Sequence, residues 1–307
     1  MEFKQILTGN LHNEFIEDKI DLIRLDERRK KEEINKKLKG GEHCFRIADN
    51  WYRLNMGYTN PLNCAKVHAE LLLMEGLSKK DKLDMINLVK DKEFIFYGVG
   101  VGDTEIVPIN WALDYKSPEV YITGIDVNRE FLENFIIALK NKLIESPKSK
   151  IFYRAYHSLF EQINKKDLNS NLLKVHFCLG NTIGNFDNQD EVFKMFSNLS
   201  QKEDLLVLGI QLNRKLDMLF EKYKDNSLFQ KFILNYVDKN EKVNLNWNLD
   251  KKNGIISAKY NDVEVFRTKK YNENKLKQDL EKNDFKLLKQ WIDQDENACI
   301  QIYKKIK

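Results

Sequence analysis

Short apolar runs alternate with amphipathic segments along the middle of this chain. Each run has five to seven mostly apolar residues, and the segments between them space apolar residues as a helix does. Because the runs lack polar alternation, we expect strands that are buried on both faces, as in a parallel sheet covered by helices. The predicted strands are 93–99, 119–125, 151–155, 174–180 and 204–210, and the predicted helices between them include 103–114, 128–143 and 188–199.

This alternation predicts an α/β fold with a doubly wound, Rossmann-like sheet. Crossover connections between parallel strands are short and right-handed, and they place helices on both faces. Near the end of the chain, residues 273–284 have helical spacing, and residues 285–292 and 298–306 have the pattern of a final strand pair. These two strands bring the predicted sheet to seven.

The pattern changes outside this core. Residues 214–239 have helical spacing, and residues 242–271 alternate apolar and polar positions like an antiparallel meander. Residues 11–40 are highly charged with mixed signs, which is typical of a solvated helix. We therefore expect an N-terminal helical segment (1–75) that contributes to a substrate region, a core (76–212 and 271–307), and an inserted helix and meander (213–270) that complete an accessory substrate-binding region.

Composition narrows the class of protein. The 307 residues include 51 basic and 47 acidic ones, so the net charge of +4 is too small to indicate a nucleic-acid partner. No apolar run reaches about 18 residues, so we expect no membrane span. The four cysteines form no CxxC pair, so we expect no metal site and a reducing, cytoplasmic setting. The pattern predicts no particular oligomeric state.

A glycine-rich turn follows the first predicted strand of the sheet. Gly98, Gly100 and Gly102 lie in the sequence FIFYGVGVGDTEIV, where that strand ends and a helix begins. Glycine permits positive φ and a close approach of ligand to backbone, and a helix start offers free N–H groups. The turn could bind a nucleotide phosphate or the adenosyl part of S-adenosylmethionine (SAM). The alternative is a tight turn that binds no ligand.

An acidic residue at the end of the next strand narrows this choice. Asp126 lies 28 residues after Gly98, where a carboxylate accepts hydrogen bonds from both ribose hydroxyls. The glycines follow the order GxGxG rather than GxGxxG, and the acidic Asp103 comes next. A carboxylate at a helix start disfavours a pyrophosphate and tolerates a sulfonium cation. These features favour SAM over a cofactor with a pyrophosphate, and a tight turn with a helix-capping aspartate stays open as the alternative.

The fourth predicted strand runs into a polar turn at the same edge of the sheet. In this turn Asn185 offers both an amide donor and a carbonyl acceptor. The sequence FCLGNTIGNF resembles the LGSTIGN element of the histidine-specific, SAM-dependent methyltransferases. The resemblance extends from about residue 94 to the C-terminus, through DLLVLGIQLNR, EKYKDNSLFQKFIL and KQWIDQDENACIQI.

The resemblance implies how the cofactor is held. The family's glycine loop and ribose-binding acid fall on Gly98, Gly100 and Asp126. The family's lysine after the loop falls on Thr104, and the acid that begins the loop falls on Phe96, so the chain departs from the family there. The cofactor-binding residues that we expect are Gly98, Gly100, Gly102, Asp126, Gly180, Asn181 and Thr182, with Tyr156 or His157 at the adenine.

The resemblance also implies a substrate site. The family holds an amino acid with the TIGN asparagine and with tyrosines, which implies catalytic roles for Asn185 and Tyr223 and a substrate contact for Tyr58. The family's glutamate and serine, which read the imidazole, fall on Phe266 and Thr268. Phe266 accepts no hydrogen bond, so we expect an N-methyltransferase for an amino acid or amino-acid-like amine other than histidine.

Two other functions fit the departures from the family. A methyltransferase fold that only binds is one, since Phe96, Thr104 and Gln211 all replace family residues. A methyltransferase of proteins or peptides is the other, with the charged N-terminal segment as the contact surface. The sequence thus predicts methyl transfer from SAM to a small-molecule amine, with these two functions as alternatives.

Overall fold

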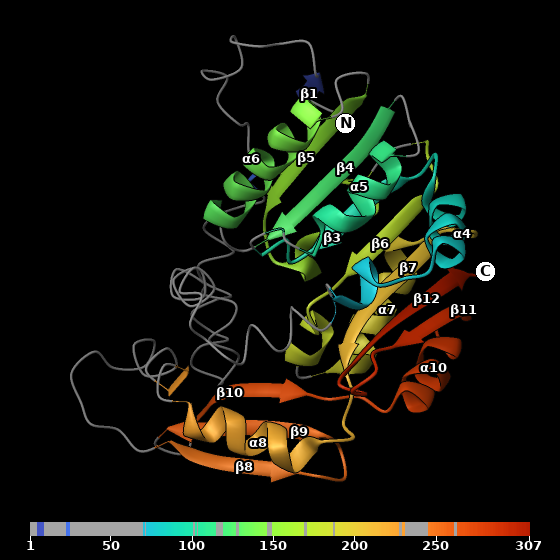
Figure 1. Cartoon of the computed structure of the whole chain (residues 1–307). Coiled ribbons are helices and arrows are strands. Elements are labelled where there is room, and N and C mark those ends of the chain that lie inside the picture. Colours follow the sequence, from blue (N-terminus) through green and yellow to red (C-terminus); the bar gives the residue numbers. More distant parts are fainter. Residues whose placement is uncertain are drawn as a thin grey trace.

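The computed structural model of this chain contains a large mixed sheet and a smaller antiparallel sheet (Figure 1). The structure describes residues 5–8, 23–24, 70, 72–100, 102, 104–114, 119–126, 129–145, 149–168, 171–186, 188–226, 229–230, 245–260 and 263–307.

Five parallel strands form the centre of the large sheet. Their order reverses between the first and the fourth of them along the chain, and such a switch point opens a crevice at the carboxyl edge. In spatial order they are β5 (Lys150–His157), β4 (Glu119–Asp126), β3 (Glu93–Tyr97), β6 (Lys174–Cys178) and β7 (Leu205–Gln211).

Two antiparallel strands complete the predicted seven. The chain returns through β11 (Phe285–Ile292) and β12 (Ala298–Lys305), and β12 lies between β7 and β11. The prediction of a final strand pair is confirmed. The spatial order β5-β4-β3-β6-β7-β12-β11 therefore leaves one reversed strand, β12, against the parallel centre.

Two short strands at the far edge lie within the segment 1–75, so the prediction of helix is wrong at residues 5–8 and 23–24. β1 (Gln5–Thr8) pairs antiparallel with β5, and β2 (Ile23–Arg24) pairs parallel with the end of β5. Without them, β5 would present a row of unpaired N–H and C=O groups, which the added strands satisfy. In this segment, Glu70 and residues 72–75 are helical, and Tyr58 lies outside the described residues.

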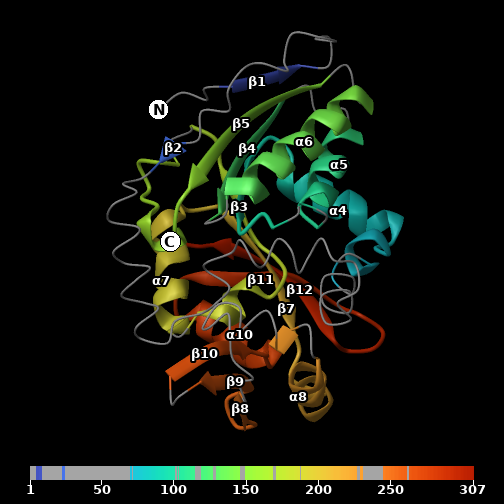
Figure 2. The same cartoon turned by 90° about the vertical axis from the view of Figure 1, so that its left-hand side faces the viewer.

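Helices cover both faces of the sheet, as a doubly wound fold requires (Figure 2). Successive side chains of β6 enter different cores, because a strand alternates its faces: Phe177 packs on one side and Cys178 on the other. Both cores are apolar, which explains why the strands show no polar alternation. One face carries α4 (Lys79–Val89), α5 (Ile106–Asp114) and α6 (Arg129–Glu145), and the other carries α7 (Gln189–Leu199) and α10 (Glu273–Glu281).

The smaller sheet lies beyond the carboxyl ends of the parallel strands (Figure 1). It is antiparallel, as the alternating pattern predicts, and its register shifts at a bulge between Glu264 and Phe266. It has its own core, in which Tyr223, Phe229 and Phe266 pack. Its elements are α8 (Leu216–Asp225), β8 (Asn246–Asp250), β9 (Ile255–Tyr260) and β10 (Val263–Lys269).

None of the described helices combines the length and the apolar character that crossing a membrane requires.

Candidate active site

Three glycines after β3 have positive φ but different surroundings. Their φ angles are 77° at Gly98, 50° at Gly100 and 85° at Gly102. A Cβ at Gly102 would lie 2.9 Å from the ring of Phe135, so this glycine allows α6 to pack closely. A Cβ at Gly100 would meet no atom within 4 Å. Gly100 is therefore the position of the three at which a ligand can approach the backbone.

Asp126 closes β4 beside this open position. Its Oδ2 accepts a hydrogen bond of 3.2 Å from the backbone N–H of Gly100, and the residue is 5% exposed. A carboxylate has about four lone-pair sites, so one N–H does not exhaust it. His157, which is partly buried, lies opposite Asp126 in the register of β4 and β5. The structure thus gathers Gly100, Asp126 and His157 at one edge, and they fit an adenosyl group.

Tyr156 lies in the core rather than at this edge. Its side chain is fully buried, and its hydroxyl donates to the backbone carbonyl of Asp167. Successive side chains of a strand point to opposite faces, so Tyr156 and His157 cannot share one side of β5. The prediction that Tyr156 binds the cofactor is corrected on this ground.

The polar turn after β6 touches the glycine loop. Gly180 has a φ of 68°, and a short 3-10 helix, η3 (Thr182–Asn185), follows. The hydroxyl of Thr182 donates to the carbonyl of Leu179 at 2.7 Å. Its methyl group would lie 3.5 Å from a Cβ at Gly98. Gly180 and Thr182, which were predicted to bind the cofactor, therefore lie at the carboxyl edge of the sheet, next to the glycine loop.

Asn181 joins three elements and is a structural residue. Its amide nitrogen donates to the hydroxyl of Thr268 at 3.4 Å and to the carbonyl of Lys269 at 3.1 Å. Its Oδ1 accepts from the N–H of Gln211 at 2.9 Å, and the residue is 1% exposed. These bonds tie η3 to β7 and β10, and a Cβ at Gly184 would lie 2.3 Å from the amide nitrogen. The prediction that Asn181 binds the cofactor is therefore corrected.

Asn185, at the end of η3, presents a buried acceptor. Its Oδ1 has no hydrogen-bond partner in the described part of the chain. The same holds for Oε1 of Gln211, which ends β7 and is 6% exposed. A buried acceptor without a partner costs about 1–3 kcal/mol, so such atoms call for an explanation. A ligand that carries N–H groups would supply the missing donors.

Three predicted substrate residues come together in the accessory region. The ring centroids of Tyr223 and Phe266 are 5.4 Å apart, and Phe266 and Thr268 are fully buried. Lys270 donates hydrogen bonds of 3.1 Å to the hydroxyls of both Tyr223 and Thr268. Burial raises the pKa of Tyr223 well above its usual value, so Tyr223 keeps its proton at neutral pH and is no general base.

Sequence reasoning missed two charged residues of this region. Glu70 is 2% exposed, its Oε2 accepts from the N–H of Gly180 at 2.6 Å, and its other oxygen lies where a Cβ of Gly209 would be. A single glutamate in HAELLL gives no signal of this position. The sequence does contain a signal for Lys270. Phe266, Thr268 and Lys270 are two positions apart, which places them on one side of an extended strand.

Two buried glutamates lie near the carboxyl end of β6. Burial raises the pKa of the Cys178 thiol, and Glu70 and Glu105 raise it further. Both glutamates are at least nine-tenths buried.

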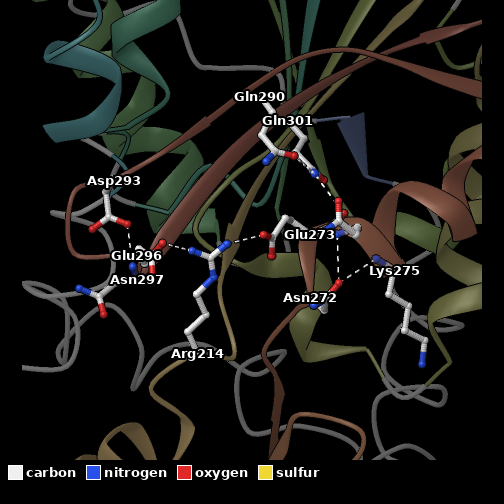
Figure 3. Close-up of polar contacts among 10 residues, drawn as sticks. Arg214, Asn272, Glu273, Lys275, Gln290, Asp293, Glu296, Asn297 and Gln301 are labelled. Atoms are coloured by element: carbon white, nitrogen blue, oxygen red, sulfur yellow. Dashed lines mark hydrogen bonds and ion pairs between the residues drawn. The ribbon is translucent and has the colours of Figure 1, made fainter.

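Arg214 ties the accessory region to the large sheet. It lies between β7 and α8, and its guanidinium pairs with Glu273, at the start of α10, and with Glu296, in the turn between β11 and β12 (Figure 3). The network in Figure 3 continues from Glu273 through its carbonyl to Gln301 of β12. Arg214 therefore links the point where the chain leaves the sheet to the point where it returns.

Replacing Arg214 with glutamine is expected to loosen this attachment. The arginine side chain is about a third exposed, so its two ion pairs together contribute about 1 kcal/mol. We expect a Michaelis constant for the acceptor about 3-fold higher, with the affinity for S-adenosylhomocysteine unchanged. Steady-state kinetics and calorimetry measure the two quantities. Lys251→Gln breaks a more exposed ion pair with Asp217 and is the matched control, with no change expected.

One protein-family model matches this chain. Residues 79–264 match a family model described as "Histidine-specific methyltransferase, SAM-dependent". No match was found among curated proteins.

Solved structures of low sequence identity also match the chain. Magnesium protoporphyrin IX methyltransferase from Synechocystis PCC 6803 is 9% identical, with a TM-score of 0.49 over 84% of this chain and 93% of that chain. The 1,6-didemethyltoxoflavin-N1-methyltransferase of Burkholderia thailandensis is 7% identical, with a TM-score of 0.48 over 90% of each chain. At these TM-scores, the likenesses carry no argument about function.

Proposed function

Since the chain belongs to the family of histidine-specific, SAM-dependent methyltransferases, we propose that it methylates the amine of an amino acid or amino-acid-like small molecule other than histidine. The cofactor is S-adenosylmethionine, and the family assigns the chain to the methyltransferases. The acceptor class is the new element of the proposal. It rests on residues of the polar turn and of the accessory sheet.

The residues at the edge of β3 and β4 fit the cofactor. SAM supplies an electrophilic methyl group carried on a sulfonium ion. Gly100 offers an open stretch of backbone, and Asp126 offers a buried carboxylate to the ribose hydroxyls. His157 lies beside Asp126, where the adenine is expected.

The buried Oδ1 of Asn185 is the observation that carries the proposal. It is an acceptor without a donor in the described residues, at the turn beside the glycine loop. A neutral amine that donates one N–H to this oxygen is held in a fixed orientation, with its lone pair free to attack. Orientation of this kind can supply much of the barrier reduction in a displacement reaction. Tyr223 keeps its proton, so its hydroxyl can donate a hydrogen bond to the amine substrate.

Phe266 argues against histidine as the acceptor. It is fully buried, and its ring centroid lies 4.9 Å from that of Phe229 and 5.7 Å from that of Trp247. Together with Tyr223 these side chains form an aromatic cluster, in which an imidazole N–H would have no carboxylate to pair with. A buried donor without a partner is costly, so an aromatic or apolar side chain fits better.

A panel of amino acids with methyl-labelled SAM tests the proposal. We expect transfer to at least one aromatic or apolar amino acid, with a kcat/KM about 100-fold above that for histidine, because Phe266 offers the imidazole no hydrogen-bond partner. Methylation of histidine alone would contradict the proposal. Cofactor binding in calorimetry without methyl transfer to any amine would favour a methyltransferase fold that only binds. Methyl transfer only to peptides would favour a methyltransferase of proteins or peptides.

Replacing Asn185 with alanine is expected to lower kcat/KM for the acceptor about 30-fold. The loss follows from one missing hydrogen bond to the amine, about 2 kcal/mol, with the cofactor contacts intact. Asn198→Ala, on the exposed side of α7, is the matched control. Equal activity of the two variants would show that the amine is held elsewhere.

Two coarser expectations complete the proposal. We infer a cytoplasmic location, supported by the buried free thiols of Cys178 and Cys299. We also infer a division into an N-terminal segment (1–75), a core (76–212 and 271–307) and a substrate region (213–270), with no nucleic-acid partner.

A further inference from the structure

Glu70 joins the segment that precedes α4 to the polar turn after β6. Glu70 is helical, as are residues 72–75, and it is 2% exposed. Its Oε2 accepts a hydrogen bond of 2.6 Å from the N–H of Gly180, the residue at which the turn begins. The two residues are 110 positions apart in the sequence. Glu70 therefore anchors the turn from a distant part of the chain.

The contact with Glu70 differs from the other hydrogen bonds of this turn. The N–H groups of Asn181, Thr182 and Gly184 each donate to a backbone carbonyl. The N–H of Gly180 donates to a side chain instead. Of these four contacts, the one at Gly180 is therefore the one that a substitution outside the turn can remove.

Gly209 leaves the space that the carboxyl group of Glu70 occupies. A Cβ at Gly209 would lie 2.5 Å from Cδ of Glu70, which is closer than real side chains approach. Gly209 belongs to β7, an interior strand of the large sheet. Glycine weakens the interior of a strand, and it often marks the close approach of a ligand or of another chain segment. The sheet thus contains a glycine where the carboxyl group needs room.

A contact that only filled space would not require a carboxyl group. Burial of a polar group costs free energy unless the group is hydrogen-bonded, and an apolar side chain avoids this cost. Compared with an apolar side chain, Glu70 adds an acceptor that fixes the N–H of Gly180. Binding sites depend on contacts of this kind, because neighbouring residues must hold the groups that meet the ligand.

The anchored turn lies against the glycine loop. Thr182 is close to both, because its Oγ1 would lie 3.8 Å from a Cβ at Gly180 and 3.6 Å from a Cβ at Gly98. The same turn ends at Asn185. A shift of Gly180 would therefore move Thr182 relative to the loop at which the cofactor is expected.

We propose that Glu70 is a positioning residue of the cofactor site. By accepting from the N–H of Gly180, it holds the polar turn in the conformation that supports the glycine loop. The inference rests on the part of the proposed function that the family shows, which is SAM as cofactor, and it does not depend on which amine is methylated.

Four variants of the full chain test this inference. Glu70→Gln keeps an oxygen that can accept from Gly180, whereas Glu70→Met has a similar length and offers at most a weak acceptor. Glu70→Ala combined with Gly209→Ala removes the acceptor and places a methyl group in part of the vacated space. Glu75→Met changes an exposed glutamate within residues 72–75 and is the matched control.

Calorimetry measures the affinity of each variant for S-adenosylhomocysteine, and urea unfolding measures its stability. We expect Glu70→Met and the double variant to bind about 10-fold more weakly than the parent, as loss of one hydrogen bond implies. Glu70→Gln should stay within about 3-fold of the parent. Hydrogen exchange in a peptide that covers residues 179–186 should be faster in the two weak variants, because the turn opens more often.

Comparison of these variants separates positioning from packing. A double variant as stable as the parent, but with the weaker affinity, would support the inference. An unchanged affinity in Glu70→Met would overturn it, as would losses that only follow the stability of each variant. If the double variant does not fold, Glu70→Gln and Glu70→Met decide, since equal losses in these two would make the acceptor oxygen irrelevant.

The amino-acid panel fails or succeeds independently of this test. Weaker cofactor binding in Glu70→Met, together with no methyl transfer to any amine by the parent, would support the inference and count against the proposed acceptor. Methyl transfer to an aromatic amino acid by Glu70→Met, at the parent's rate and with the parent's affinity for S-adenosylhomocysteine, would support the proposed function and overturn the inference.

Discussion

The substitution Asp126→Ala is expected to weaken the binding of S-adenosylhomocysteine about 100- to 1000-fold. Two hydrogen bonds from ribose hydroxyls to a carboxylate, each about 1.5–2 kcal/mol, would be lost. The contact from Oδ2 to the N–H of Gly100 would be lost as well, and that contact holds the glycine loop beside the strand end. Because Asp126 is only 5% exposed, water does not compensate fully for the missing carboxylate.

Asp126→Asn separates the two contributions. An asparagine keeps one oxygen that can accept from Gly100, but its amide nitrogen cannot accept from a hydroxyl. We expect a loss of about 10- to 30-fold, between the parent and the alanine variant. Titration calorimetry measures all three affinities, and Asp190→Ala, at an exposed position of α7, is the control. Losses below about 3-fold in both variants would place the nucleoside elsewhere.

The second large effect is expected on stability. Arg154→Met should destabilise the fold by about 3–5 kcal/mol, because it leaves a carboxylate in the core without its cation. Arg154 and Glu93 are fully buried, and their charged atoms are 2.6 Å apart. Thr123 also donates to Glu93 at 2.6 Å, and Arg154 donates to the carbonyl of Asp167 at 3.3 Å. The network crosses β3, β4 and β5, so its loss affects the centre of the sheet.

A double substitution distinguishes a pairing effect from a packing effect. Glu93→Leu with Arg154→Met removes both charges and keeps most of the volume. Breaking a buried pair costs far more than replacing it with apolar residues, so the double variant should recover to within about 1–2 kcal/mol of the parent. Urea and thermal unfolding measure the three stabilities. A double variant less stable than Arg154→Met would mean that packing, not the lost charge partner, dominates.

The strands of the large sheet are predictable because both of their faces are buried. β3 and β7 have no polar residue except at one end, and such runs between helical segments are typical of a parallel sheet. β1 and β2 are not predictable in this way. They have four and two residues, too few to show a period, and they form because the edge of β5 offers partners. Their cause lies in the tertiary structure.

In the candidate site, too, the sequence predicts one part and the tertiary structure determines the rest. Asn181 and Asn185 lie in one motif, and their residue type gives no means to separate their roles. The backbone separates them: Asn181 has a φ of 55° and uses its whole amide within the protein, whereas Oδ1 of Asn185 has no partner in the described residues. Tyr156 and His157 differ in a similar way, because their side chains point to opposite faces of β5. Sequence identifies the motif, and strand direction and backbone angle decide which side chains are used within the protein.

The position of β12 has a consequence for biosynthesis. This strand lies between β7 and β11, yet residues 298–305 are translated after every other strand of the structure. While they are still within the ribosome, the edge of β7 stays open, and β11 has no neighbour through which to join the sheet. An open apolar edge is the site at which nascent chains associate wrongly, and chaperones protect such chains. Ribosome-bound chains that stop before residue 298 should therefore depend on chaperones for solubility, and chains that include residues 298–305 should not.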